Sequence, residues 1–117
     1  MIDTHCHLTS QGLSERVDEV IEAARSAGVE RMISVATKRQ DAEAAVELAR
    51  QYEGVFATVG IHPHEAGRWQ DPGAIGDLLS SLCERRGVVA FGEMGLDWFY
   101  KDPPRDVQRR CFELQLN

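Results

Sequence analysis

Four short apolar runs alternate along the chain with segments in which apolar residues recur at helical spacing. Three runs cover residues 31–37, 55–61 and 88–92, and residues 1–8 form a shorter, less apolar one. Near-continuous runs of this length are typical of strands buried on both faces of a sheet. The helical stripes comprise Leu13, Val17, Val20, Ile21 and Ala24; Ala42, Ala45, Val46 and Ala49; Ile75, Leu78, Leu79 and Leu82; and Val107, Cys111 and Leu114.

Residues that begin and end helices fall at the boundaries of these stripes. Thr37, with a glutamine three residues later, has the spacing of a capping box. The pairs Asp71-Pro72 and Asp102-Pro103 each place an acidic N-cap before a proline at the first helical position. Glycines suited to left-handed helix ends stand at Gly28, Gly54 and Gly87.

The order of elements is therefore strand, then helix, four times over. Such alternation predicts an α/β fold with a parallel sheet and right-handed crossovers. Four βα units are half of the eight that close a TIM barrel of roughly 250 residues. We expect residues 1–117 to form a single, partial domain that corresponds to the front half of a larger fold.

Composition and charge exclude several classes of protein. The 117 residues are 43% hydrophobic and 27% charged, which is ordinary for a globular chain and unlike a disordered one. No stretch approaches the ~20 consecutive apolar residues of a membrane span. The formal net charge of −6 argues against a protein that coats nucleic acid, but not against an enzyme that handles phosphates at a metal.

The beginning of the sequence and its cysteines bear on the cellular compartment. The first apolar run starts at Met1, so we expect no signal peptide. The chain has three cysteines, an odd number, and they lie far apart in sequence with no CxxC motif: Cys6, Cys83 and Cys111. These features predict a location in the reducing cytoplasm.

The strongest chemical signal is the pair of histidines in the first apolar run. Side chains alternate along a strand, so Asp3, His5 and His7 share one face. The two imidazoles can converge on one cation, and Asp3 could orient one of the rings. The alternative is a pair of histidines at a polar strand end. We favour a metal site, because active sites of such folds lie at the carboxyl ends of strands.

A second signal follows the run of residues 88–92. Glu93 comes directly after this run, where a carboxylate is costly unless a metal or another group pairs with it. Gly92 and Gly95 would let the backbone turn tightly around such a site. A solvated loop carboxylate is the alternative for Glu93, and Asp97 could simply hold the loop by hydrogen bonds.

Two further segments remain open in their roles. His62 falls at the end of the run 55–61, before Pro63, and could bind a metal, contact a phosphate or lie in a surface loop; we favour contact with substrate. Residues 98–100 are all aromatic and could stack nucleobases, with Lys101 meeting a phosphate. Packing beneath the loop is the commoner role for such a run, and we expect it here.

Taken together, these motifs resemble the TatD family of metal-dependent deoxyribonucleases. The resemblance rests on residues 2–8, 59–64 and 90–97, and extends over essentially the whole chain. The helix that follows is similar to the family's at Pro104, Arg105, Gln108, Phe112 and Gln115.

The resemblance implies the N-terminal half of a TIM barrel of the amidohydrolase superfamily. It implies a divalent metal site, often of two ions (Mg, Mn or Zn), and hydrolysis of DNA phosphodiesters, typically as a 3'-5' exonuclease on single strands. On this basis His5, His7 and Glu93 are expected metal ligands, with Glu93 bridging and catalytic. His62 and Asp97 are expected to bind substrate.

The sequence also departs from the family pattern, and this leaves other functions open. The family's further ligands, two histidines and an aspartate on later strands, have no counterpart in these 117 residues. One alternative is another amidohydrolase-type enzyme that cleaves an amide or ester bond. Another is a non-catalytic half-barrel, which could associate with a second copy of itself.

Overall fold

The strands form one parallel sheet in chain order, β1-β2-β3-β4. The computed structural model describes residues 1–69 and 71–117. Two 3-10 helices, η1 and η2, accompany four strands and four α-helices. The elements are β1 Ile2–Cys6, η1 Ser14–Arg16, α1 Val17–Ser26, β2 Arg31–Ser34, α2 Arg39–Gln51, β3 Val55–Val59, η2 Pro63–Arg68, α3 Pro72–Leu82, β4 Val88–Phe91 and α4 Arg105–Leu116. The predicted alternation of strands and helices is confirmed.

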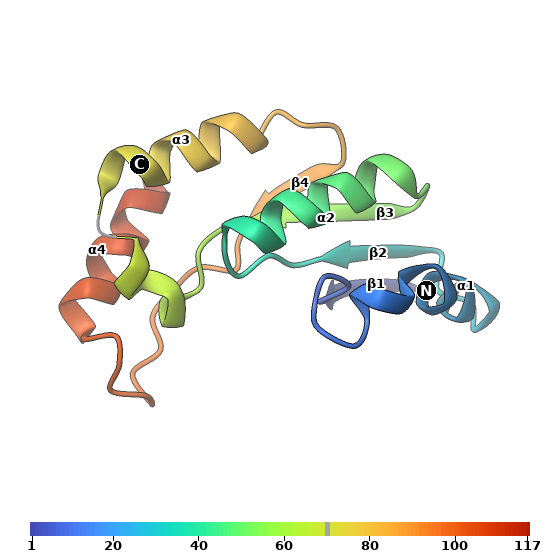
Figure 1. The fold of residues 1–117 in the computed structure, drawn as a ribbon, viewed down its shortest axis with the longest axis horizontal. Helices are drawn as coiled ribbons and strands as arrows, with labels where there is room; N and C mark the ends of the chain where they lie inside the picture. The colour runs from blue at the N-terminus through green and yellow to red at the C-terminus, as the bar shows by residue number, and fades with distance from the viewer. Residues whose placement is uncertain (70) are drawn as a thin grey trace.

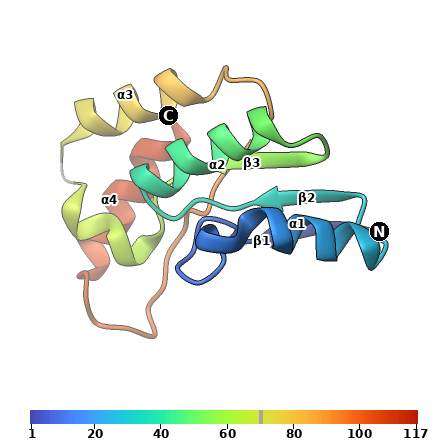
Figure 2. The ribbon, with the colours of Figure 1, turned by 45° about the vertical axis from the view of Figure 1, so that its right-hand side comes forward.

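Helices α1 and α2 lie along the sheet, whereas α4 lies beyond the carboxyl ends of the strands, which point toward it (Figures 1 and 2). Helix α2 packs against β3, whereas α4 packs against α3 and η2. This arrangement places the loops that follow the strands at one end of the molecule. Among the described residues, no helix combines the length and the hydropathy needed to cross a membrane.

Two hydrophobic clusters form the core between sheet and helices. The larger joins β3, α2, α3 and α4, and the smaller lies under α1. The predicted stripes supply much of the buried surface, through Ile21, Ala42, Ala45, Ile75, Leu78, Leu82 and Cys111. The other face of the sheet differs, because Val89 and Phe91 of β4 are half-exposed there.

The predicted helix boundaries at Gly28 and Asp71 are confirmed, whereas α2 ends at Gln51, three residues before Gly54, and α3 ends at Leu82, five residues before Gly87. Gly28, Gly54 and Gly87 all have positive φ, at 89°, 80° and 92°. Asp71 is the N-cap of α3, and its side chain accepts a hydrogen bond from the Gly73 backbone N–H. These residues fix where the chain leaves one element for the next.

Two predicted helix starts are wrong. Lys38, not Thr37, is the N-cap of α2, and the Thr37 hydroxyl instead donates to the Asp41 carboxylate at 2.5 Å. Helix α4 begins at Arg105 rather than at Pro103. The reason is the second proline, Pro104, because a residue that precedes proline is disfavoured in helical conformation.

Candidate metal centre

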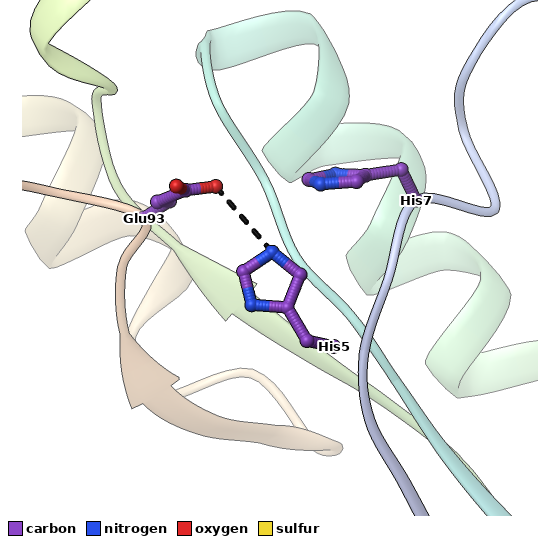
Figure 3. Close-up of side chains that lie close together, drawn as sticks. All are labelled: His5, His7 and Glu93. Atoms are coloured by element: carbon purple, nitrogen blue, oxygen red, sulfur yellow. Dashed lines mark ion pairs between the residues drawn. The ribbon is translucent and has the colours of Figure 1, made fainter.

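Three side chains converge at the carboxyl end of the sheet: His5, His7 and Glu93 (Figure 3). One potential ligand atom from each lies within 4.8 Å of the others. His5 Nε2 is 3.5 Å from Glu93 Oε2, and the two imidazole centroids are 5.1 Å apart. We call these three residues the metal cluster. Within residues 1–69 and 71–117, no other such group of histidine, cysteine and carboxylate side chains is found.

Glu93 reaches this cluster from the opposite edge of the sheet. In a flat sheet the first and fourth strands would lie about 14 Å apart, at ~4.8 Å per strand. After β4, however, the chain crosses the end of β3. The Gly92 N–H donates to the Val59 carbonyl at 2.9 Å, and the Glu93 N–H donates to the Ala36 carbonyl, beyond β2, at 2.8 Å. The backbone at Glu93 therefore lies directly beside the extension of β2, the strand next to β1.

A glycine and a threonine make this crossing possible. A Cβ atom added at Gly60 would lie 2.6 Å from the Gly92 carbonyl carbon, so only glycine lets the two backbones approach. The buried Thr58 hydroxyl donates to the Gly92 carbonyl at 2.5 Å and accepts from the Ala36 N–H at 3.1 Å. Sequence reasoning missed Thr58, although a polar residue inside an apolar run was a usable signal.

The His7 ring is oriented by the backbone. Its Nδ1 lies 2.9 Å from the Val35 carbonyl oxygen, which can only accept a hydrogen bond. Nδ1 therefore carries the proton, and the lone pair of Nε2 remains available to a cation. Among the described residues no hydrogen bond joins Asp3 to either ring, contrary to the suggestion from the sequence; its Oδ1 instead accepts from the His5 backbone N–H at 3.0 Å.

The His62 ring has the opposite arrangement. His62 is the N-cap of η2, and its Nδ1 accepts a hydrogen bond from the His64 backbone N–H at 3.1 Å. The neutral ring therefore carries its proton on Nε2, which lies 3.6 Å from Glu93 Oε1. Partial burial lowers the pKa of His62, although the Glu93 charge opposes this, so the neutral form is favoured. His62 presents a donor beside the metal cluster.

Asp97 lies outside the metal cluster and is held by its own loop. Its Oδ1 accepts from the Phe99 N–H at 2.9 Å, and its Oδ2 is 2.7 Å from His64 Nε2. The Phe99 hydrogen bond, together with His64, lowers the pKa of the Asp97 carboxyl. Asp97 also donates its backbone N–H to Gln108 Oε1 at 2.8 Å. The carboxylate thus fixes the loop between β4 and α4.

Two buried glutamines of α4 hold the loops around the site by hydrogen bonds. The sequence pattern alone predicted no role for either of them. Gln115 accepts from the Ile61 N–H at 2.7 Å and donates to the Ile61 carbonyl at 3.1 Å. Gln108 binds Asp97 and the Pro103 carbonyl. Both flank Cys111 on the buried face of α4, where the aliphatic stripe alone was expected. The spacing of the two glutamines, seven residues apart with Cys111 between them, could have indicated that both side chains lie on the buried face of the helix.

The aromatic segment does not pack beneath its loop as expected. Trp98, Phe99 and Tyr100 are 46%, 85% and 56% exposed. Tyr100 contacts the His64 ring edge-to-face, with centroids 4.9 Å apart. The segment is therefore joined to the site through His64, and its rings face solvent.

The metal cluster opens into a hollow of about 410 Å³. A larger one, about 680 Å³, lies at the opposite end of the strands and includes Arg25, Arg31 and Tyr52. By volume alone, the hollow at the opposite end would be the better candidate for a binding site. By chemistry, the hollow at the metal cluster is the better candidate, because among the described residues potential metal ligands converge only there. The smaller hollow is lined by His5, His7, Thr37, His62, His64, Glu65 and Glu93.

Comparison with known proteins gives concordant matches in sequence and structure. The chain is 41% identical over 116 residues to the 3'-5' ssDNA/RNA exonuclease TatD of Cronobacter sakazakii, covering 99% of this chain and 43% of that protein. It is 34% identical over 118 residues to the uncharacterized metal-dependent hydrolase YabD of Bacillus subtilis, covering 99% of this chain and 45% of that one. The chain therefore spans less than half the length of these relatives.

Solved structures confirm the fold as the N-terminal half of a TIM barrel. The TatD homologue YJJV of Escherichia coli superposes with a TM-score of 0.89 at 32% identity, covering 99% of this chain and 45% of that structure. A TatD-family hydrolase of Entamoeba histolytica gives 0.85 at 25% identity, covering 98% and 44%. The family model described as TatD related DNase matches residues 2–117. The chain belongs to the family of TatD-related DNases.

Proposed function

We propose that these residues form the first part of a divalent-metal site that hydrolyses phosphodiester bonds of single-stranded DNA or RNA from the 3' end. The observation that carries the proposal is the convergence of His5, His7 and Glu93 on one space at the carboxyl end of the sheet. The relatives' names, a 3'-5' ssDNA/RNA exonuclease and a metal-dependent hydrolase, support the reaction class.

The donor set fits a divalent cation. Imidazole nitrogens and a carboxylate suit Zn²⁺ and Mn²⁺, and carboxylate with water suits Mg²⁺. The two Glu93 oxygens face different neighbours, Oε2 toward His5 and Oε1 toward His62. From the family resemblance we propose that Glu93 would bridge two ions in the complete site. When bound, such ions lower the pKa of water and offset charge on the phosphoryl group.

We further propose that His62 and Asp97 serve the substrate. The His62 Nε2–H points into the hollow and can donate to a phosphate oxygen beside the metal cluster. Asp97 acts through its hold on His64 and the loop after β4. Both roles consist of positioning the phosphate, which is most of what an enzyme contributes to phosphoryl chemistry.

The aligned segment of the relatives holds only part of the ligand set that the family resemblance implies. The family resemblance supplies two histidines and an aspartate on later strands, and relatives extend to more than twice the aligned length. We also propose a cytoplasmic location, since Cys6, Cys83 and Cys111 are all free thiols.

A chimera tests the function with these residues in place. Residues 1–117 would replace the aligned segment of the Cronobacter exonuclease, and 3'-labelled single-stranded DNA would be the substrate. We expect degradation that EDTA abolishes and that Glu93→Gln lowers by several orders of magnitude. Full activity of Glu93→Gln, in a chimera with normal circular dichroism, would overturn the assignment.

A second candidate is a hydrolase of amide or ester bonds with the same ligands. It is favoured by the lining of the hollow, which contains Glu65 and Glu93 but neither lysine nor arginine. A polyanion gains little attraction from such a lining. A panel of lactone, acyl-ester and single-stranded DNA substrates, given to the same chimera, separates the two candidates by their kcat/KM values.

A further inference from the structure

We propose that Trp98, Phe99 and Tyr100 form a platform on which bases of single-stranded nucleic acid stack next to the metal cluster. This proposal rests on the proposed function and adds where the bases lie. The three residues are called the aromatic platform below. Figure 1 shows their segment as part of the long loop between β4 and α4, which projects from the carboxyl end of the sheet.

The exposure of the platform is the first argument. Phe99 is 85% exposed, so its ring contributes little to the core. Phe99 and Tyr100 meet edge-to-face, with centroids 5.0 Å apart, and this geometry leaves ring faces open. Contiguous exposed aromatic surface of this kind marks a binding site more often than chance. A flat π-face is what a nucleobase of any sequence can stack on.

The rigidity of the loop is the second argument. Asp97 accepts the Phe99 N–H, and the buried Gln108 holds both Asp97 and Pro103 by hydrogen bonds. The Arg105 guanidinium lies 4.8 Å from the centre of the Trp98 ring. These contacts hold the loop and cover one face of Trp98, while Phe99 stays 85% exposed, so a ligand would lose less entropy on binding than with a loose loop.

Continuity with the metal cluster is the third argument. Glu93 Oε1 lies 3.6 Å from His62, the His62 and His64 centroids are 4.5 Å apart, and Tyr100 contacts His64. A strand with its scissile phosphate beside the metal cluster would therefore run over His62 and His64 onto the rings. Bases near the reacting phosphate are the part of the substrate that the platform would take.

Charge indicates that stacking, rather than phosphate attraction, provides the contact. Lys101 and Arg105 are cationic, but Asp102 and Asp106 stand beside them in sequence. The chain carries a formal net charge of −6. Binding driven by phosphates falls steeply with salt, whereas base stacking does not. We therefore expect binding that depends on bases and only weakly on salt.

The test measures binding without catalysis. A fluorescein-labelled thymidine oligonucleotide and an abasic strand with the same number of phosphates are titrated with the 117-residue chain in EDTA, and anisotropy is recorded. We expect the oligonucleotide to bind more tightly than the abasic strand. Phe99→Ala should weaken oligonucleotide binding roughly 5- to 140-fold, the equivalent of one base–aromatic stack.

Two matched variants separate stacking from general apolar contact. Phe99→Leu keeps apolar surface but lacks a π-face and should bind nearly as weakly as Phe99→Ala, whereas Phe99→Tyr should bind as the original chain does. Leu116→Ala removes an exposed apolar side chain at the far end of α4 and should change nothing.

Equal binding of the abasic strand, unchanged binding by Phe99→Ala, or no binding by the original chain overturns the platform. The platform is also overturned if Phe99→Ala forms smaller oligomers but still binds the oligonucleotide. That result would show that Phe99 contacts another protein chain and not a base. Because EDTA is present throughout, these results are independent of hydrolysis. Nuclease activity in the chimera with unchanged binding by Phe99→Ala would overturn the platform and leave the proposed function standing.

Discussion

At the scale of single residues, backbone groups decide which nitrogen each histidine of the site presents. The Val35 carbonyl accepts a hydrogen bond from His7 Nδ1–H and leaves the Nε2 lone pair available to a cation. The His64 backbone N–H occupies the Nδ1 lone pair of His62 and leaves Nε2–H as a donor. Two chemically identical side chains thus receive different roles from their immediate surroundings.

This difference predicts unequal effects of removing the two rings. His7→Ala should weaken Zn²⁺ or Mn²⁺ binding by more than the ~10–100-fold that loss of a supporting outer group costs. His62→Ala should leave the metal affinity within about threefold, because its ring is a donor rather than a ligand. Isothermal titration calorimetry on the 117-residue chain gives both values. Equal losses in the two variants would show that His62 is itself a ligand.

At the scale of elements, α4 is more than a simple amphipathic helix, because its side chains hold two loops by hydrogen bonds. Gln115 satisfies both the N–H and the carbonyl of Ile61, directly before His62, and Gln108 satisfies the N–H of Asp97. All of these contacts are buried or partly buried, where an unpaired polar group is expensive. The helix therefore links the stability of the fold to the geometry of the site.

Replacing the second glutamine should show this link. Gln115→Leu keeps the volume of the side chain but leaves two backbone groups of Ile61 unpaired, at ~1–3 kcal/mol each. We expect the free energy of unfolding in urea to fall by roughly 2–6 kcal/mol. Gln51→Leu, at the exposed end of α2, is the control and should stay within about 0.5 kcal/mol. A Gln115→Leu chain as stable as the control would mean that water satisfies Ile61 instead.

Two glycine-to-alanine substitutions should change the free energy of unfolding in opposite directions. The reason is that only one of the two glycines lies where the chain after β4 crosses the end of β3. Gly60→Ala would place a methyl group 2.6 Å from the Gly92 backbone and should lower the free energy of unfolding by roughly 1–3 kcal/mol. Gly76 lies on the exposed side of α3 with no atom within 4 Å of an added Cβ, so Gly76→Ala should raise it by about 0.5–1 kcal/mol. Thermal denaturation followed by circular dichroism measures both changes.

The Gly60 variant also separates the fold from the site. If the crossing positions Glu93, Gly60→Ala should lose Zn²⁺ affinity even under conditions where the chain remains fully folded. Gly76→Ala should bind Zn²⁺ unchanged. Normal metal binding by folded Gly60→Ala would show that contacts other than this crossing position Glu93.

At the scale of the whole molecule, the sequence predicted what depends on local pattern and missed what depends on distant contacts. Strands, helices and the Asp71 cap follow from neighbouring residues, and the structure confirms them. The pairing of Glu93 with Ala36 joins residues far apart in sequence, and no periodicity encodes it. The partners of Thr58 and Gln115 are of the same kind. His5, His7 and Glu93 could be predicted as metal ligands because each stands in or directly after an apolar run and because resemblance to a family carries such distant information.

The uncovered face of the sheet is a further property of the whole molecule. Val88 packs against the larger core cluster, so Val89 and Phe91 point to the other side, where both are half-exposed. In the described residues β1 and β4 are the edges of the sheet, and edge strands promote association. In the barrel of the relatives, the second half of the fold would cover this face.

From this surface we predict that the 117-residue chain associates with itself. Sedimentation velocity at micromolar concentration should show species larger than a monomer. Val89→Lys and Phe91→Lys should each shift the distribution toward the monomer, because a charge on the apolar face must be desolvated on association. Leu116→Lys adds the same charge at an exposed position of α4 and should leave the distribution unchanged. A monomeric original chain would show that the exposed apolar face alone does not drive association, and an equal response to all three lysines would assign the effect to net charge.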